Sequence, residues 1–290
     1  MRCPAKVNLG LWILGRRADG YHEVDTFLQA VSLEDELILT PGPPGLALEV
    51  RGRAIPGPGP NVIERAFALL EEGGFLPRGA GVRARLTKRI PAGSGLGGGS
   101  SDGAGFLVGV ERLLGIDLGA TKRHALAARL GSDVPFFLRG GLARATGRGD
   151  EVRHLCPMKP YWVLLASPAT AISTTWAYAQ LRYPLTEDRH RATVLASAME
   201  RSDLHGVVDA MQNAFEPVIL PRLPEVADLK RAISSSGVMG ALLSGSGSTV
   251  FGVVPSRLEG QAALRTLGGR LAEVRLARSS ERGVIVSRLG

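Results

Sequence analysis

Cysteine and long apolar runs are scarce in this chain of 290 residues, and each scarcity excludes a class of protein. The two cysteines, Cys3 and Cys156, stand far apart with no spacing typical of a metal or redox site, and no histidine pair indicates zinc. No apolar run reaches the roughly 18 residues of a membrane-spanning helix. The apolar stretch 7–15 is followed by no signal-peptide cleavage site. We therefore expect a cytoplasmic protein with no membrane partner.

Lysine is also scarce, although the chain is basic, with a formal net charge of +8. Five of the 35 basic residues are lysines, which leaves 30 arginines. The arginines are scattered, without a run of five or six, and aromatic residues do not alternate with them. Because nucleic-acid sites gather basic side chains in one patch, we expect no nucleic-acid partner but a small-molecule substrate.

Glycine, by contrast, is concentrated in one segment. Residues 91–102 hold five glycines and three serines directly before a helix-like stretch. Glycines let backbone N–H groups approach an anion, and the helix that follows adds unpaired N–H groups and a positive dipole end. The hydroxyls of Ser100 and Ser101 are placed to contact phosphate oxygens or a magnesium ion. The segment therefore predicts a phosphate-binding loop.

Other glycine patterns fit this loop less well. The match of Gly93–Gly98 to G-x-G-x-x-G, with Asp117 as a ribose-binding acid, leaves a dinucleotide-dependent oxidoreductase as an alternative. However, the preceding segment 82–88 alternates apolar with polar residues, whereas a buried parallel strand is apolar throughout. The match of Gly99–Gly103 to the hydrolase pattern G-x-S-x-G follows glycines, which are poor strand formers. No lysine follows as in a P-loop, and a flexible linker fits badly between a patterned strand and an apolar helix.

Three segments in order resemble the motifs of the GHMP kinases, the family of galactokinase, homoserine kinase, mevalonate kinase and phosphomevalonate kinase. They are Pro4–Leu9, Pro91–Ser101 and Leu243–Phe251. Arg17–His22 and Leu130–Phe137 resemble one branch of that family. Its members use ATP to phosphorylate the 2-hydroxyl of a cytidine diphosphate derivative of methylerythritol, in the non-mevalonate route to isoprenoid precursors. The resemblance implies this reaction, with a homoserine-type or mevalonate-type kinase, or a protein that binds ATP without turnover, as alternatives.

The resemblance also implies an α+β two-domain GHMP kinase fold with the active site in the cleft. A β-rich ATP-binding domain would take residues 1–156 and a ferredoxin-like domain residues 157–290. Asn61, with Glu64 three residues later, predicts a capped helix start. Hydrophobic periodicity predicts helices over 100–114 and 121–130 and strands over 5–14, 23–31, 36–40, 46–51, 82–88, 161–167, 240–243 and 249–254. Periodicity alone would give only a two-domain α+β protein.

A catalytic pair and an ATP site follow from the same resemblance. Asp133 matches the family's catalytic aspartate and would take the proton of the attacking hydroxyl, with Lys6 beside it to keep the carboxylate ionised. Without the motif, Asp133 would be a turn acid and Lys6 a solvated strand residue. Magnesium is expected with the phosphates, although no ligand can be named. The implied ATP-binding residues are Lys88 and Asn61, which would flank the adenosine, and those of the loop: Pro91, Ala92, Gly93, Ser94, Gly95, Leu96, Gly97, Gly98, Gly99, Ser100 and Ser101.

Cytidine recognition requires an aromatic face and hydrogen bonds to the base, each stack contributing roughly 1–3 kcal/mol. Tyr178 is expected to stack on the face opposite Tyr21 and His22, with Trp176 as the alternative and ordinary helix packing as the other explanation for Tyr178. The substrate-binding residues that the resemblance implies are Asn8, at the erythritol end, Tyr21, His22, Thr174 and Tyr178.

One segment departs from the family pattern. The family often shows Asn-Asp-x-Glu where this chain reads Asn213-Ala214-Phe215-Glu216. Because Asn213 and Glu216 remain, we expect the acid that is missing at position 214 to have a structural role in the family. Its absence leaves the predicted reaction unchanged.

Overall fold

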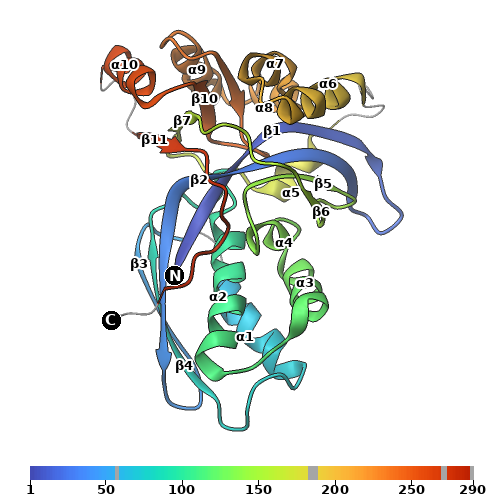
Figure 1. The fold of residues 1–290 in the computed structure, drawn as a ribbon, viewed down its shortest axis with the longest axis vertical. Coiled ribbons are helices and arrows are strands. Elements are labelled where there is room, and N and C mark those ends of the chain that lie inside the picture. Colours follow the sequence, from blue (N-terminus) through green and yellow to red (C-terminus); the bar gives the residue numbers. More distant parts are fainter. Residues whose placement is uncertain (56–58, 182–188, 269–272, 288–290) are drawn as a thin grey trace.

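Two β-sheets with helices packed against them make up the residues that the computed structural model describes, 1–55, 59–181, 189–268 and 273–287. Figure 1 shows the long strands β1 and β2 running between the two ends of the molecule. Helices α1 to α3 lie at the lower end with β3 and β4, and helices α6, α7, α9 and α10 lie at the upper end. The predicted mixture of helices and strands is confirmed.

The larger sheet has the order β3-β4-β2-β1-β8, with β5 paired to β2 and β6 paired to β5. Its strands are β1 (Arg2–Arg16), β2 (His22–Pro41), β3 (Gly45–Gly52), β4 (Gly81–Lys88), β5 (Leu142–Thr146), β6 (Glu151–His154) and β8 (Gln212–Asn213). Strand β4 alternates buried and exposed residues as predicted, and it lies antiparallel to β2. The glycine loop therefore does not follow a central strand of an all-parallel sheet, which a dinucleotide-binding fold requires.

The second strand is longer than predicted. The sequence indicated separate strands over 23–31 and 36–40, whereas β2 is continuous from His22 to Pro41. Its pairing with β1 shifts register between Pro4 and Ala5, so the strand bulges there but does not end. The charged residue Asp35, which interrupted the apolar pattern, is fully buried and accepts a hydrogen bond from the backbone N–H of Ile90 at 2.9 Å.

The helices described in the first half are α1 (Val62–Glu72), α2 (Gly98–Leu114), α3 (Gly119–Leu130) and α4 (Val134–Phe137). Helix α2 packs on β1 and β2, and α3 packs on the other three helices. Helix α1 has the predicted capping box, in which the side chain of Asn61 accepts from the N–H of Ile63 at 2.9 Å and that of Glu64 accepts from the N–H of Asn61 at 2.6 Å. The predicted helices over 100–114 and 121–130 are confirmed as α2 and α3. Helix α2 is buried over most of Ser101–Glu111, so the glycine loop before it is held against the core.

The smaller sheet has the order β11-β7-β10-β9, with antiparallel neighbours throughout. Its strands are β7 (Trp162–Ala166), β9 (Gly240–Leu243), β10 (Val250–Val254) and β11 (Val274–Arg278). Numbered along the chain, the order is 4-1-3-2, which is that of the ferredoxin-like fold and agrees with the prediction. The helices of this half are α5 (Thr174–Ala179), α6 (Arg189–Glu200), α7 (Leu204–Ala210), α8 (Glu216–Ile219), α9 (Pro224–Ser234) and α10 (Arg257–Leu267).

The division of the chain into domains 1–156 and 157–290 stays a prediction. Several backbone pairs join residues on the two sides of this boundary. Strand β8 pairs with β1 through Gly10 and Leu11, and isolated bridges join Arg2 to Ile285 and Val31 to Ser279. The last described segment thus returns from the smaller sheet to the N-terminal half, as Figure 1 shows.

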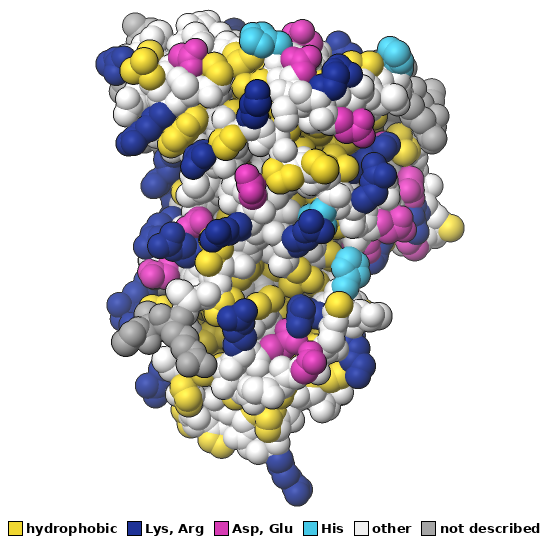
Figure 2. Space-filling model, in the orientation of Figure 1, with side chains coloured by type: hydrophobic (Ala, Val, Ile, Leu, Met, Phe, Trp, Pro, Cys, Tyr) yellow, Lys and Arg dark blue, Asp and Glu magenta, His cyan; other side chains and the backbone are white. Residues whose placement is uncertain are grey.

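The surface charge is dispersed on the face drawn in Figure 2, where Lys and Arg side chains are spread among Asp and Glu side chains from one end of the molecule to the other. Within the described ranges, no helix combines the length and the apolar character needed to cross a bilayer.

Candidate active site

Three adjoining cavities bring together most of the residues predicted from the sequence. The central cavity, of about 310 Å³, is lined by Lys6, Asn8, Asp133 and most of the glycine loop. A second cavity, of about 680 Å³, is lined by Tyr21 and His22 and shares four wall residues with the first: Ser132, Arg148, Thr174 and Tyr178. We call it the tyrosine cavity.

The third cavity, of about 1020 Å³, lies on the other side of the glycine loop, and we call it the Asn61 cavity. It is lined by Asn61 and Lys88, and it shares Ala92, Gly93, Gly99 and Ile172 with the central cavity. The central cavity therefore lies between two larger ones, an arrangement that would let two ligands meet end to end at Lys6 and Asp133.

Lys6 and Asp133 form an ion pair in the central cavity, with 3.5 Å between Lys6 Nζ and Asp133 Oδ2. Lys6 lies on β1 and its side chain is only 4% exposed, whereas Asp133, just before α4, is 32% exposed. Lys6 Nζ also donates a hydrogen bond to Asn8 Oδ1 at 2.6 Å, and Asn8 Nδ2 donates to Thr26 Oγ1 at 2.8 Å. The ammonium is thus held in place, while the carboxylate faces the cavity and remains accessible to a ligand.

The glycine loop has a backbone conformation that side chains would prevent. Gly95 has φ +77°, and a Cβ there would stand 2.0 Å from the carbonyl oxygen of Ser244; Gly97, at φ +70°, is the N-cap of α2. The N–H of Ile172 donates to Gly93 O at 2.9 Å. The loop is therefore packed against two other segments, and its open side, with the N-terminus of α2, forms a cradle that fits phosphate groups.

Two predicted loop residues do not line the cavity. Leu96 is fully buried in the hydrophobic core, although its carbonyl accepts a hydrogen bond from the backbone N–H of Lys6 at 3.0 Å. Ser101 is also fully buried, and its hydroxyl has no hydrogen-bond partner among the described residues. Ser100 is the hydroxyl of this pair that reaches the central cavity.

Lys88 has a different environment from the one that an adenosine contact would suggest. Its ammonium bonds to Asp35 Oδ2 and, at 2.7 Å, to Asp102 Oδ2, and all three side chains are at most 3% exposed. Although burial lowers it, the two carboxylates raise the pKa of Lys88 above its usual value. Burial raises the pKa of Asp102 to about 7, against the lowering effect of Lys88. Lys88 is therefore part of a buried charged cluster in the wall of the Asn61 cavity.

Aromatic side chains meet where the central and tyrosine cavities join. The rings of His22 and Tyr178 are stacked, with centroids 4.5 Å apart, and Phe215 meets Tyr178 edge-on at 5.0 Å. Trp176 is 38% exposed and lines none of the three cavities, so the geometry favours Tyr178 over Trp176 as a stacking residue. Burial, and then the charge of Arg16, lower the pKa of His22, which favours a neutral ring at neutral pH.

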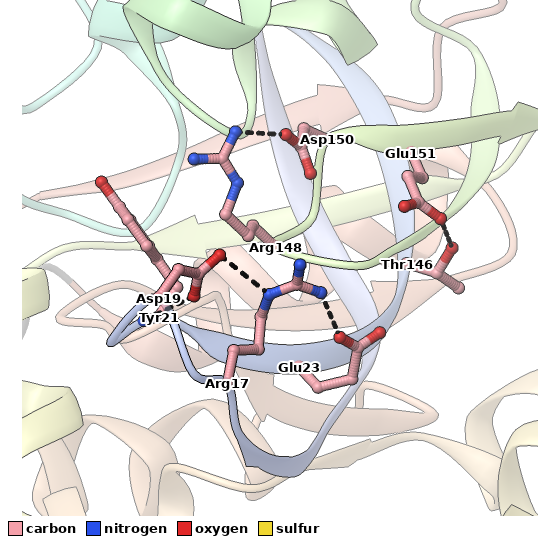
Figure 3. Close-up of polar contacts among 8 residues, drawn as sticks. All are labelled: Arg17, Asp19, Tyr21, Glu23, Thr146, Arg148, Asp150 and Glu151. Atoms are coloured by element: carbon pink, nitrogen blue, oxygen red, sulfur yellow. Dashed lines mark hydrogen bonds and ion pairs between the residues drawn. The ribbon is translucent and has the colours of Figure 1, made fainter.

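Sequence reasoning missed Arg148, which lines both the central and the tyrosine cavity. In Figure 3 it extends from the turn between β5 and β6, donates to Asp150 Oδ2 at 2.7 Å, and lies over the ring of Tyr21, 5.0 Å from its centroid. The hydrogen bond with Asp150 raises the pKa of Arg148, so it carries a full positive charge. The flanking glycines, Gly147 and Gly149, both have positive φ, and this Gly-Arg-Gly pattern was the available signal for a turn that presents an arginine.

The comparison with known proteins agrees with this fold. The model of the GHMP kinase N-terminal domain matches residues 61–141, and that of the GHMP kinase C-terminal domain matches residues 195–272. The 4-diphosphocytidyl-2-C-methyl-D-erythritol kinase of Symbiobacterium thermophilum is 43% identical over 94% of both chains. That of Shouchella clausii is 37% identical over 97% of this chain and 95% of its own.

Solved structures give the same result. A crystal structure of 4-(cytidine 5'-diphospho)-2C-methyl-D-erythritol kinase has a TM-score of 0.78 and 32% identity, covering 97% of this chain and 99% of its own. Homoserine kinase from Cytophaga hutchinsonii, at 20% identity and a TM-score of 0.69 over 97% and 94% of the two chains, shares the fold alone.

The fold and the cradle are those of an ATP-using small-molecule kinase, and the chain belongs to the GHMP kinase family. Within this family it belongs with the 4-diphosphocytidyl-2-C-methyl-D-erythritol kinases, the name that its relatives of 37% to 43% identity carry. This is the branch predicted from Arg17–His22 and Leu130–Phe137, and the predicted GHMP kinase fold is confirmed.

Proposed function

We propose that this protein transfers a phosphoryl group from ATP to the 2-hydroxyl of 4-diphosphocytidyl-2-C-methyl-D-erythritol, a step of the non-mevalonate route to isoprenoid precursors. The observation that carries the proposal is the position of Lys6 and Asp133 between the tyrosine cavity and the Asn61 cavity. The tyrosine cavity would take the cytidine end of the substrate, and the Asn61 cavity would take the adenosine of ATP.

In this arrangement Asp133 accepts the proton of the attacking hydroxyl. The ammonium of Lys6, 3.5 Å away, pairs with the carboxylate and stabilises the negative charge that develops on the reacting oxygens. The glycine loop and the N-terminus of α2 hold the phosphates of ATP with backbone N–H groups. Positioning and charge stabilisation of this kind contribute most of the catalysis in phosphoryl transfer.

Magnesium fits this site as a companion of ATP. The described residues contain no group of three or more acidic, histidine or cysteine side chains able to hold a metal, whereas Mg²⁺ with nucleotides is held largely by phosphate oxygens and water. Ser100 and Asp133, both on the wall of the central cavity, are the protein oxygens that would complete its shell. The ion would neutralise charge on the phosphates.

The direct test is turnover of the purified protein with Mg-ATP and three parallel alcohols: the cytidine substrate, mevalonate and homoserine. We expect ADP release and a product heavier by one phosphoryl group with the cytidine substrate alone. Phosphorylation of mevalonate or homoserine instead would overturn the assignment of the tyrosine cavity. ATP binding without any turnover would support a non-catalytic protein, and thermal protection by a nicotinamide dinucleotide would support an oxidoreductase.

Arg148 is our candidate for the residue that binds the diphosphate of the substrate. It stands between Tyr21, where the base would stack, and the central cavity, where the hydroxyl would react. A diphosphate joins these two parts of the substrate, and arginine donates paired hydrogen bonds to phosphate oxygens. Asp150 accepts a hydrogen bond from one end of the guanidinium. Among the described residues, the other N–H groups of Arg148 make no further side-chain hydrogen bond that would compete with a phosphate.

Replacement of Arg148 by methionine is expected to weaken binding according to the number of phosphates on the ligand. Calorimetric titration with cytidine, CMP and CDP should show a dissociation constant for CDP raised by about 10- to 150-fold, with that for cytidine little changed, because charge-assisted hydrogen bonds contribute about 1.5–3 kcal/mol. Arg17→Met is the control, since Arg17 pairs with Asp19 and Glu23 and lines neither cavity (Figure 3). Equal weakening of cytidine and CDP in R148M would show that Arg148 only supports the ring of Tyr21.

A further inference from the structure

The segment Asn213–Glu216, where the chain departs from the family pattern, holds the loop of the third motif in place. Asn213 is only 3% exposed, and its Nδ2 donates to two backbone carbonyls, Leu243 O at 2.7 Å and Gly245 O at 2.8 Å. Its Oδ1 accepts from the N–H of Phe215 at 2.8 Å. One amide side chain therefore satisfies three buried backbone groups, which fixes the position of residues 243–245.

Glu216 adds a second attachment to the same place. Its Oε1 accepts from the N–H of Leu243 at 2.9 Å, and its Oε2 pairs with Lys230 Nζ at 2.5 Å. The end of β9 is thus held on both its carbonyl and its N–H side by residues three apart in sequence.

The loop that these residues hold packs directly against the catalytic lysine. At Gly245, a Cβ would stand 3.3 Å from Lys6 Nζ and 3.4 Å from Asn8 Oδ1. Ser244 Oγ donates to Gly95 O at 3.0 Å, so the same loop also contacts the glycine loop. A displacement of residues 243–245 would therefore change the space available to the ammonium of Lys6.

The segment is fixed to the strand that carries Lys6 as well. Leu11 of β1 pairs with Asn213, and Leu11 O accepts from the N–H of Ala214 at 2.9 Å. Ala214, which stands where the family often has an acid, thus contributes to this attachment through its backbone. Asn213 consequently connects the backbone of β1 with the loop that touches the head of Lys6.

We propose that Asn213 is a positioning residue for the catalytic pair, which acts through Gly245 to set the place of Lys6 Nζ relative to Asp133. This assignment rests on the proposed kinase function and specifies what the Asn213–Glu216 segment does in it. Misplacement of a catalytic group by about 1 Å lowers turnover by up to about 100-fold. Asn213 therefore affects the chemical step more than the binding of either substrate.

Asn213→Asp tests the assignment, because it keeps the oxygen that accepts from Phe215 and removes the two donors to Leu243 and Gly245. We expect kcat to fall by about 30-fold, while KM for ATP and for the cytidine substrate changes by less than about threefold. Lys230→Met is the matched control, since it breaks the ion pair of Glu216 and leaves the bonds of Asn213 intact. It should lower Tm and leave kcat unchanged. If N213D lowers kcat no more than K230M at equal loss of Tm, the assignment is wrong.

A second variant covers the case in which N213D does not fold. Gly245→Ala places a methyl group 3.3 Å from Lys6 Nζ and keeps the side chain of Asn213, but it also strains the loop, because Gly245 has φ +55°. It should lower kcat by at least as much, with intact KM. A foldable double variant should lose no more than about the larger single effect, because both changes act on one contact. Fully additive losses would contradict the assignment.

A readout without turnover separates this inference from the proposed function. Acylation of the lysines, followed by peptide mass measurement, reports the access of reagent to buried Lys6 relative to exposed Lys159. We expect N213D and G245A to speed acylation of Lys6 at least about tenfold, since displacement of the loop opens the space around the amine, which is 4% exposed in the wild type. Unchanged labelling in both variants would overturn the positioning role. Wild-type protein that phosphorylates no alcohol would contradict the proposed function alone.

Discussion

Asp133→Asn is expected to lower kcat by about 10²- to 10⁴-fold while leaving the binding of ATP nearly intact. The amide has the shape of the carboxylate but cannot take the proton of the attacking hydroxyl, and it has no charge to pair with Lys6. Asp133 belongs to none of the hydrogen bonds that hold the glycine loop among the described residues, so the cradle for phosphates should persist. Steady-state kinetics and calorimetric titration with ADP measure the two quantities separately.

Asp117→Asn is the matched control for this substitution. Asp117 accepts a hydrogen bond from the N–H of Gly119 at 2.8 Å and lines none of the three cavities. It is also the residue that a dinucleotide-binding loop would use for ribose. We therefore expect D117N to keep wild-type turnover. Normal turnover in D133N would remove Asp133 from the proton transfer, and a large loss in D117N would reopen the dinucleotide hypothesis.

Local sequence signals predicted the parts of the structure that depend on neighbours in the chain. The capping box of α1 depends on Asn61 and Glu64, three residues apart, and its geometry is as predicted. The alternation of residues 82–88 predicted a strand with one exposed face, which β4 has. In both cases the energies that decide the structure lie within a single turn or strand, and the sequence shows them directly.

Local sequence signals could not predict the burial of charged residues whose partners are distant in the sequence. Asp35 falls between the predicted strands 23–31 and 36–40, yet it lies inside a continuous β2, where Lys88, 53 positions away, pairs with it. Lys88 was predicted to contact the adenosine on the basis of the family resemblance. Nothing in the sequence indicated that Asp35 and Asp102 would pair with it. A charged residue is expected on the surface from sequence alone, because only the folded structure shows whether an oppositely charged partner is close enough to allow burial.

The aromatic residues show a limit of another kind. Tyr178 and His22 were predicted on opposite faces of a base, and the structure instead stacks their rings on each other at 4.5 Å. The two ring faces pack against each other. The sequence shows which residues are aromatic but not which ring each of them packs against.

Lys88→Met is expected to lower the free energy of unfolding by about 3–5 kcal/mol, because it leaves the buried carboxylates of Asp35 and Asp102 without their cation. The side chains of Asp35 and Asp102 are 0% and 1% exposed, so water cannot replace the lysine. The loss should extend to the ATP site. Asp35 accepts from the N–H of Ile90 just before the glycine loop, and Asp102 lies in α2 just after it, so the cluster joins both ends of the loop.

The loss should also depend on pH. Burial raises the pKa of Asp102 from 3.8 to about 7, so the folded state holds this proton more tightly than the unfolded chain does. The stability that results is complete below pH 3.8 and is lost as the pH rises through about 7. Without the opposing charge of Lys88 the pKa of Asp102 rises further. Urea unfolding should therefore show a larger deficit of K88M at pH 8 than at pH 5.5.

Asp102→Asn provides the control, since a neutral amide of the same size cannot titrate. Its free energy of unfolding should improve relative to the wild type as the pH rises from 5.5 to 8, the direction opposite to that of K88M. A deficit of K88M below about 1 kcal/mol at both pH values would show that Lys88 is not the cation that holds this cluster. If instead K88M keeps wild-type stability but loses affinity for ATP, Lys88 contacts the nucleotide directly, as the family resemblance alone had suggested.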